Sequence, residues 1–293
     1  MSSPTTEFQS VSDCLKGFIR KARFALRMEN PFENKPMPLS RGDSKEEKAQ
    51  ENLLESCREF RTFFETVAQK EDRKIILAWD EYENFHRLLQ KESEEGQRLL
   101  EAMRSFSQHQ NQVIFLFTGL LLFADLPGEP DFSRYFVHAH RLKVDFLKKE
   151  AAEKLITRPY PEFNLIYPPE TVEKIWQLTC GHPALLQHIC FEMVNIANMH
   201  NRKEMKQDDL ETVCREKVLD RGNAVMTTFW KDFCAGTLKT TVMEIMQKQT
   251  SANRSDVVRL LDYGFIQETE AGKYRLRVPL FEQWIAKYGE SFR

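Results

Sequence analysis

Two acidic residues directly follow a short apolar run in the first half of the chain. Residues 74–79 read Lys-Ile-Ile-Leu-Ala-Trp, and Asp80 and Glu81 come next. A continuous apolar run of this length predicts a strand that is buried on both faces. At the carboxyl end of a parallel strand, Asp80 could hold the waters of a Mg²⁺ ion, and Glu81 could deprotonate an attacking water. The alternative is that Asp80 only caps the next helix and that Glu81 is solvated.

A second apolar run, residues 112–117, ends in Thr118 and Gly119. Between the two runs, residues 95–108 carry apolar side chains at helical spacing. Strand, helix and strand in this order predict a parallel sheet that is covered by helices, with Thr118 at the tip of the strand that follows Asp80 along the chain. The alternative for Thr118 and Gly119 is an ordinary strand end that begins a turn.

The third candidate group is Gly181-His182-Pro183. Gly181 permits a sharp backbone turn, and Pro183 suits the first position of a helix because its missing N–H has no partner there. The alternative is an ordinary helix start. His182 and three neighbours, Cys180, His188 and Cys190, also offer four ligands for zinc, but their spacing differs from that of zinc fingers. We favour a helical core over a metal site, and free thiols for the six cysteines.

Periodicity predicts the remaining elements. Two helices are expected before the first strand, at 11–27 and 46–70, and a third strand is expected near Leu142, Val144 and Phe146. After residue 147 the chain is expected to be helical, with helices at 151–156, 170–178, 183–199, 208–219, 223–234, 238–248 and 254–263. A hairpin with strands at 265–267 and 274–277 follows. Three helices and a hairpin are the outline of a winged helix.

Together these features resemble STAND-type ATPases, which are close to the AAA-like and archaeal-type P-loop ATPases. The resemblance covers most of the chain, and it rests on the segments 75–81, 117–119, 150–159, 179–187 and 260–284. It implies an α/β class fold: a partial P-loop NTPase-type parallel sheet with covering helices, then a helical lid and a winged-helix domain. The expected parts are a partial nucleotide-binding core at 1–145, a lid at 146–220 and a winged helix at 221–293.

The same resemblance implies roles for the candidate residues. Asp80 matches the Mg²⁺ ligand of the Walker B motif, which acts through water, Glu81 matches the catalytic base, and Thr118 matches sensor 1. Gly181, His182 and Pro183 match the lid motif that contacts the nucleotide base. ATP or ADP with Mg²⁺ are the implied cofactors. The arginine finger is not placed by the sequence, which offers Arg134, Arg141 and Arg158.

The sequence departs from that family in the phosphate-binding loop. It contains no G-x-x-x-x-G-K-[ST] motif, and its 11 glycines stand singly. Either the chain begins after this loop, so that it is truncated, or the loop has been lost. Without the loop Asp80 has no anchored phosphate to serve, so we expect no ATP hydrolysis.

Net charge and hydropathy argue against two classes of partner, nucleic acid and membranes. With 42 basic and 44 acidic residues the net charge is −2, which argues against binding nucleic acid through bulk positive charge. The longest apolar stretch, 113–124, is too short to span a bilayer, and the N-terminus lacks a signal-peptide pattern, so we expect a cytoplasmic protein without a membrane partner.

The sequence therefore predicts a nucleotide-switch ATPase of STAND/AAA-like type that does not hydrolyse ATP as given. Its expected partners are nucleotide in the complete protein, and a second copy or an effector protein. The alternative is a non-catalytic winged-helix regulator that acts through protein or DNA contacts. From 236 to 293 there are 9 basic and 7 acidic residues, so we favour a packing and switch role for this segment over DNA binding.

Overall fold

The chain forms two compact units, residues 1–141 and 142–293, and each has its own apolar core. The computed structural model describes part of the chain, namely residues 15–17, 19, 55–56, 58–67, 74–91, 93–109, 113–234, 236–251, 253–269 and 272–292. The predicted division into three parts at 145/146 and 220/221 stays a prediction. Within the described ranges, no helix has the length and apolar character that a membrane span requires.

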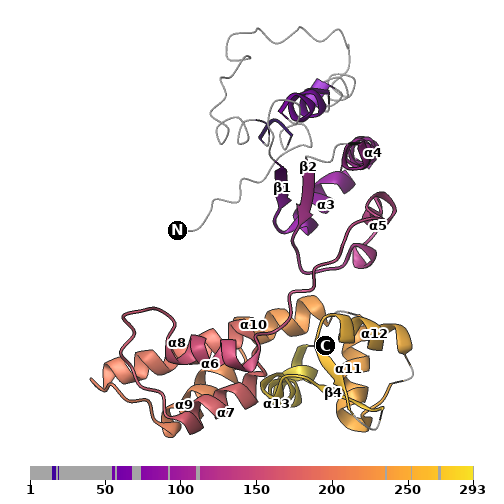
Figure 1. Ribbon diagram of the computed structural model, residues 1–293. Helices are drawn as coiled ribbons and strands as arrows, with labels where there is room; N and C mark the ends of the chain where they lie inside the picture. The colour runs from indigo at the N-terminus through magenta and orange to yellow at the C-terminus, as the bar shows by residue number, and fades with distance from the viewer. Residues whose placement is uncertain are drawn as a thin grey trace. The chain divides into compact units, whose positions relative to one another are not determined.

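The first unit contains a parallel pair of strands, β1 (Ile75–Trp79) and β2 (Val113–Phe117), which lie side by side in Figure 1. The helices α3 (Tyr82–Lys91) and α4 (Ser93–His109) connect them. The predicted strand, helix and strand are thus confirmed. Helix α3 was not predicted, although its buried residues Tyr82, Phe85, Leu88 and Leu89 follow the helical period.

The two faces of this sheet differ. Leu77 and Trp79 are 6% and 5% exposed and belong to the core of the first unit, whereas Ile76 and Ile114 are 61% and 42% exposed. The prediction that the strands are buried on both faces is therefore wrong for the described residues. Side chains alternate along a strand, and α3 and α4 contribute their buried side chains to the core on the Leu77 side only.

After β2 the chain passes through two short helices, η1 (Phe123–Asp125) and α5 (Phe132–Tyr135). Phe132 is fully buried, and its ring lies 6.0 Å or less from those of Phe117, Phe123 and Phe136. The predicted third strand is wrong, because residues 139–148 form neither a helix nor a strand. Leu142 and Val144, on which it rested, are 80% and 95% exposed. Three alternating apolar residues do not form a strand without a partner for their backbone N–H and C=O groups.

The second unit begins with helices that match the predicted ones closely. They are α6 (Lys149–Thr157), α7 (Pro169–Thr179), α8 (Pro183–Met199) and α9 (Gln207–Val213). The helix predicted at 208–219 continues beyond α9 as one π-helical turn, η2 (Cys214–Val218).

The C-terminal part confirms the predicted order of three helices and a hairpin. The helices are α10 (Ala224–Thr228) with its π-helical continuation η3 (Phe229–Phe233), α11 (Thr237–Lys248) and α12 (Arg254–Asp262). The antiparallel strands β3 (Ile266–Glu268) and β4 (Tyr274–Leu276) follow, then α13 (Pro279–Tyr288) and η4 (Gly289–Phe292). Helix α13 was not predicted. It places Phe281 and Trp284 in the same core as α6 to α9.

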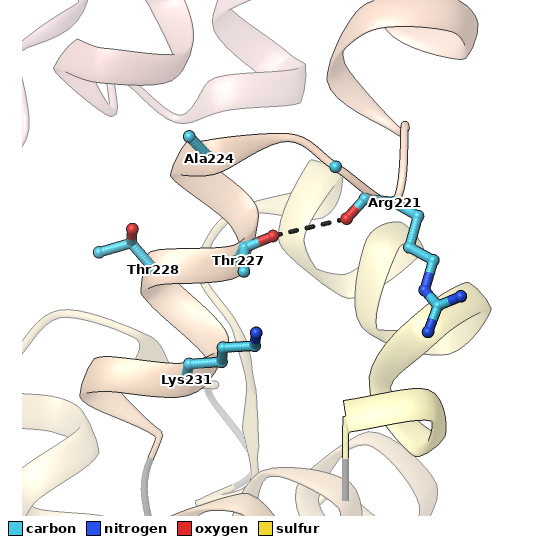
Figure 2. Close-up of a pocket in the computed structure, with 6 residues that line it drawn as sticks. Arg221, Ala224, Thr227, Thr228 and Lys231 are labelled. Carbon is cyan, nitrogen blue, oxygen red and sulfur yellow. Dashed lines mark hydrogen bonds between the residues drawn. The ribbon is translucent and has the colours of Figure 1, made fainter.

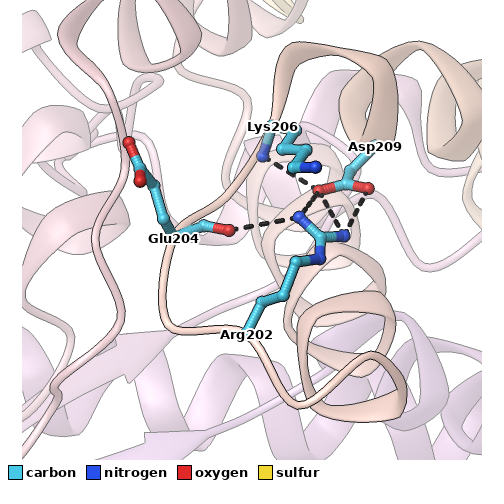
Figure 3. Close-up of polar contacts among 4 residues, drawn as sticks. All are labelled: Arg202, Glu204, Lys206 and Asp209. Atoms are coloured by element: carbon cyan, nitrogen blue, oxygen red, sulfur yellow. Dashed lines mark hydrogen bonds and ion pairs between the residues drawn. The ribbon is translucent and has the colours of Figure 1, made fainter.

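A buried aspartate fixes the connection between α8 and α9. Asp209 is 8% exposed and receives hydrogen bonds from both terminal nitrogens of Arg202, at 2.9 to 3.1 Å. It also accepts the backbone N–H of Lys206 at 2.9 Å (Figure 3). Burial opposes the ionisation of Asp209, but these hydrogen bonds outweigh it, so the pKa of this carboxyl lies below its ordinary value.

Candidate functional site

The structure brings Asp80 and Thr118 together at the edge of the parallel sheet. Trp79 pairs with Phe117 in the ladder, so the residues that follow them lie side by side. The Thr118 hydroxyl donates to Asp80 Oδ1 at 2.5 Å, and the Thr118 N–H donates to the carbonyl of Trp79 at 2.8 Å. Both side chains are exposed. A parallel register therefore places the two predicted residues in one site.

Glu81 lies beside this pair in a left-handed backbone conformation, with φ +50°. Its N–H donates to Asp80 Oδ1 at 3.1 Å, so the same oxygen accepts from Glu81 and from Thr118. The Glu81 carboxylate accepts from Asn84 Nδ2 at 2.8 Å. A residue other than glycine with this φ costs about 1–2 kcal/mol, and such residues concentrate at functional sites.

A third carboxylate, that of Glu83, shapes the site, although it is not among the residues predicted from the sequence. Glu83 accepts the backbone N–H groups of Leu120 and Leu121, the latter at 2.7 Å. Tyr82 supports the same loop, because its N–H donates to the Thr118 carbonyl at 3.0 Å. A Cβ on Gly119 would lie 2.5 Å from the Glu83 carboxylate and 2.6 Å from the Tyr82 ring, so a larger residue here would displace these side chains. A sequence pattern could have indicated Glu83, because an acidic residue three positions after Asp80 is typical of the first turn of a helix.

The donor set of this site suits a hydrated cation only in part. Mg²⁺ prefers oxygen ligands and is held by one or two carboxylates together with substrate phosphates. Asp80 supplies one carboxylate, and the Thr118 hydroxyl donates to it. In the part of the chain that the structure describes, no group of three or more acidic, histidine or cysteine side chains could hold a metal ion. The residues present therefore do not fit a resident metal without a phosphate ligand.

Gly181, His182 and Pro183 lie in the second unit, where they join α7 to α8. Gly181 has φ +76°, and a Cβ there would lie 2.2 Å from the Leu147 carbonyl oxygen. The Leu147 N–H donates to the Gly181 carbonyl at 3.0 Å. Pro183 is the first residue of α8. The sharp turn and the helix start are thus both confirmed, while nucleotide contact by these residues stays a prediction.

His182 is packed between aromatic rings. Its ring centroid lies 4.9 Å from that of Phe146 and 5.3 Å from that of Phe281. Its Nδ1 accepts the N–H of Leu185 at 3.4 Å, so it is the N-cap of α8. Burial lowers the pKa of His182 to about 4, and the ring is therefore neutral at pH 7.

The segment before α6, residues 145–147, is attached to this turn and to the hairpin. We call it the strap. Arg277 donates to Asp145 Oδ1 at 2.6 Å, and its guanidinium lies 4.1 Å from the centre of the Phe146 ring. The hydrogen bond from Arg277 is the main reason why the pKa of Asp145 lies below its ordinary value. No sequence pattern predicts this contact, because the two residues are 132 positions apart.

The four side chains that could bind zinc, those of Cys180, His182, His188 and Cys190, differ in their surroundings. His188 Nε2 lies 3.3 Å from Asn223 Nδ2, whereas His182 is enclosed by Phe146 and Phe281. Burial raises the pKa of Cys190 to about 11, so its thiol stays protonated. Of the arginines considered as fingers, Arg134 lies in α5 and Arg158 is the C-cap of α6.

Two hollows on the second unit are lined by other residues. One, of about 540 Å³, is formed by Arg221, Gly222, Ala224, Thr227, Thr228 and Lys231 (Figure 2). The Thr227 hydroxyl donates to the Arg221 carbonyl at 3.5 Å, and Thr228 points to the opposite side of the helix from Arg221. These side chains do not converge on a common point. The other hollow lies between α7, α9 and α13.

Comparisons with known proteins place the chain in no family. No protein-family model matches the sequence, and no curated protein matches it. Among solved structures, the chain is similar to Thermotoga maritima RuvB, described as a Holliday junction branch migration motor, with a TM-score of 0.40, 12% identity and 98% of each chain covered. Two variants of RuvB share 13% identity at the same TM-score, over 79% of this chain and 74% of theirs. A TM-score of this size is too low to establish a common fold.

Proposed function

We propose that this chain is an AAA-like switch protein of STAND type that does not hydrolyse ATP. The observation that carries the proposal is the hydrogen bond between Thr118 and Asp80 at the ends of adjacent parallel strands. Asp80 and Thr118 correspond to the Walker B aspartate and to sensor 1, and Glu81 to the base. We assign residues 146–220, with helices α6 to α9, to the lid, and residues 221–293, from α10 through α13, to the winged helix.

In this proposal Asp80 holds water molecules of Mg²⁺ only when the phosphates of a nucleotide complete the coordination. Glu81, held by Asn84 at 2.8 Å, faces water and is the group that would orient a nucleophile. The sequence has no phosphate loop, and phosphoryl transfer depends mainly on positioning and charge stabilisation. The chain therefore acts through its contacts with other proteins and not through turnover.

An ATPase assay on the whole chain tests the proposal. We expect phosphate release at the rate of buffer with ATP and Mg²⁺, and the same rate for Glu81→Gln. Isothermal titration calorimetry measures ATP binding in the presence of Mg²⁺. The variant is Asp80→Asn, and the control is Asp208→Asn, which changes an exposed aspartate of α9. Turnover that Glu81→Gln abolishes would contradict the proposal.

A second candidate is a winged-helix regulator that binds DNA, and one observation favours it. Asp256 on α12 is 4% exposed, and its carboxylate accepts hydrogen bonds from Thr241 and Asn253 at 3.1 and 2.7 Å. Because its carboxylate is buried, Asp256 would not repel the phosphates of DNA. The exposed positions of α12 include Arg254 and Ser255. Binding of duplex DNA that Arg254→Glu weakens and Lys203→Glu preserves would favour this candidate.

A further inference from the structure

The second unit carries a groove of about 350 Å³ between α7, the π-helical end of α9 and α13. Figure 1 shows these three helices near one another. The apolar part of its lining consists of Leu178, Leu210, Cys214 and Leu219. Leu210 is 1% exposed, while Leu178, Cys214 and Leu219 are half-buried. The groove therefore offers a partly covered apolar floor.

Charged residues surround this floor, and most are basic. Lys174 from α7, Arg215 from η2 and Lys287 from α13 line the groove and are exposed. Glu211 is the only acidic residue among those that line it. Arg215 contacts the adjacent Glu216 at 3.1 Å, and Lys287 lies 4.8 Å from the centre of the Tyr288 ring. Three cations, from α7, η2 and α13, thus line the groove, and one of them, Arg215, is paired with Glu216.

One wall of the groove has an unusual backbone. Residues Cys214 to Val218 form a π-helical turn at the end of α9. Such turns are rare, and they occur frequently at functional sites. This turn carries Cys214 of the floor and Arg215 of the rim, so the irregular backbone coincides with the groove. Burial raises the pKa of Cys214 to about 11, so its thiol is neutral and serves as part of the apolar floor.

We infer that this groove binds an amphipathic helical segment of a partner protein, with apolar side chains on one face and acidic residues beside them. Helices bind in grooves through apolar side chains spaced at three and four residues. The basic rim selects carboxylates on the partner and speeds its association, because opposite charges attract across the interface. The inference does not depend on nucleotide binding.

The test uses the full chain and two designed peptides of equal length. Each carries three leucines on one helical face, and the flanking residues are glutamate in one peptide and lysine in the other. Both peptides carry a fluorophore, and binding is measured by fluorescence anisotropy. We expect the acidic peptide to bind at least about tenfold more tightly than the basic one, because charge complementarity governs the difference.

Variants assign that binding to the groove. Lys174→Glu and Lys287→Glu should each weaken the acidic peptide by roughly fivefold to tenfold, since one favourable contact becomes repulsive. Lys203→Glu, an exposed lysine outside the groove, is the matched control and should bind like the unchanged chain. Circular dichroism establishes that each variant is folded.

A second measurement does not rely on charge. Alkylation by iodoacetamide, followed by mass spectrometry of peptides, reports on each cysteine separately. The acidic peptide should slow alkylation of Cys214, which lines the groove, and leave Cys180 unchanged. The inference is overturned if the two peptides bind equally, if neither binds, or if Lys203→Glu weakens binding as much as Lys174→Glu does. Binding of duplex DNA that is lost in the groove variants, without peptide binding, also overturns it.

Discussion

At the scale of single residues, the turn between α7 and α8 is determined by steric contact. Gly181 has φ +76°, and a Cβ there would meet both the Leu147 carbonyl and the Trp176 ring, at 2.2 and 2.6 Å. His182 beside it is neutral and packed against aromatic rings. The turn therefore holds the strap whether or not it also contacts a nucleotide.

Gly181→Ala should destabilise the chain by about 2–4 kcal/mol, because it adds a close contact to the cost of a positive φ. Gly272→Ala is the control: its φ is +66°, but nothing lies within 4 Å of the added Cβ. The free energy of unfolding of that variant should fall by only about 1 kcal/mol. Urea unfolding measures both, and equal losses would mean that the contact with Leu147 is unimportant.

Asp209 gives the chain a pH-dependent contribution to stability. Its pKa is lower in the folded state than in the unfolded chain. The contribution is therefore fully present above the ordinary aspartate pKa, and it is lost as the pH falls through the lower folded value. The urea midpoint should drop less between pH 5 and pH 3 for Asp209→Asn than for the unchanged chain. An identical drop in both proteins would contradict this assignment.

At the scale of elements, the sheet of β1 and β2 has one face that is packed against the core and one face that is exposed. Leu77 is 6% exposed, whereas its neighbour Ile76 is 61% exposed. Ile114 on β2 lies on the same exposed face as Ile76, to which it is paired in the ladder. Among the described residues, no helix covers the apolar side chains of this face as helices usually do on both sides of a parallel sheet.

Ile76→Thr should change the free energy of unfolding by no more than about 0.5 kcal/mol relative to the unchanged chain, since the side chain is exposed. It should also reduce aggregation, because it removes apolar surface. Leu77→Ala, one position away, should cost about 2–4 kcal/mol through the cavity that it leaves. Urea unfolding and light scattering measure the two effects, and a large loss of stability in Ile76→Thr would mean that this face is packed.

The strap supports a prediction about the link between the hairpin and α6. The Leu147 amide donates to Gly181, and Arg277 holds Asp145 and Phe146 nearby. Arg277→Ala should therefore speed hydrogen exchange at the Leu147 amide, while the amides in the middle of α8 exchange as before. Arg275→Ala on β4, which is two residues away, is the control. Unchanged exchange at Leu147 would show that Arg277 does not hold the strap.

At the scale of the whole molecule, the two units are unequal in their cores. The second unit has one core that joins α6 to α9 with the C-terminal helices, and it includes the fully buried side chains of Trp230 and Trp284. The sheet of the first unit has the exposed face described above. A core that spans all the helices of a unit favours cooperative unfolding.

Residues 142–293 produced alone should therefore fold and unfold in a single transition, whereas residues 1–141 alone should aggregate. In the whole chain, hydrogen exchange should be slower in α8 than in β2. Circular dichroism, light scattering and exchange measured by mass spectrometry provide the data. Protection in β2 equal to that in α8 would mean that the sheet is as stable as the helical unit.

The sequence by itself determined the features that depend on local order. It predicted β1, β2 and the helices from α6 to α12, because side-chain periodicity and residues such as Pro183 act within one element. It also placed Asp80 and Thr118 at strand ends, and their proximity follows from parallel pairing. Only the tertiary structure decided that the sheet has an exposed face, that residues near Val144 form no strand, and that Arg277 reaches Asp145. These features depend on contacts between distant segments, and no local pattern records which partner a side chain will meet.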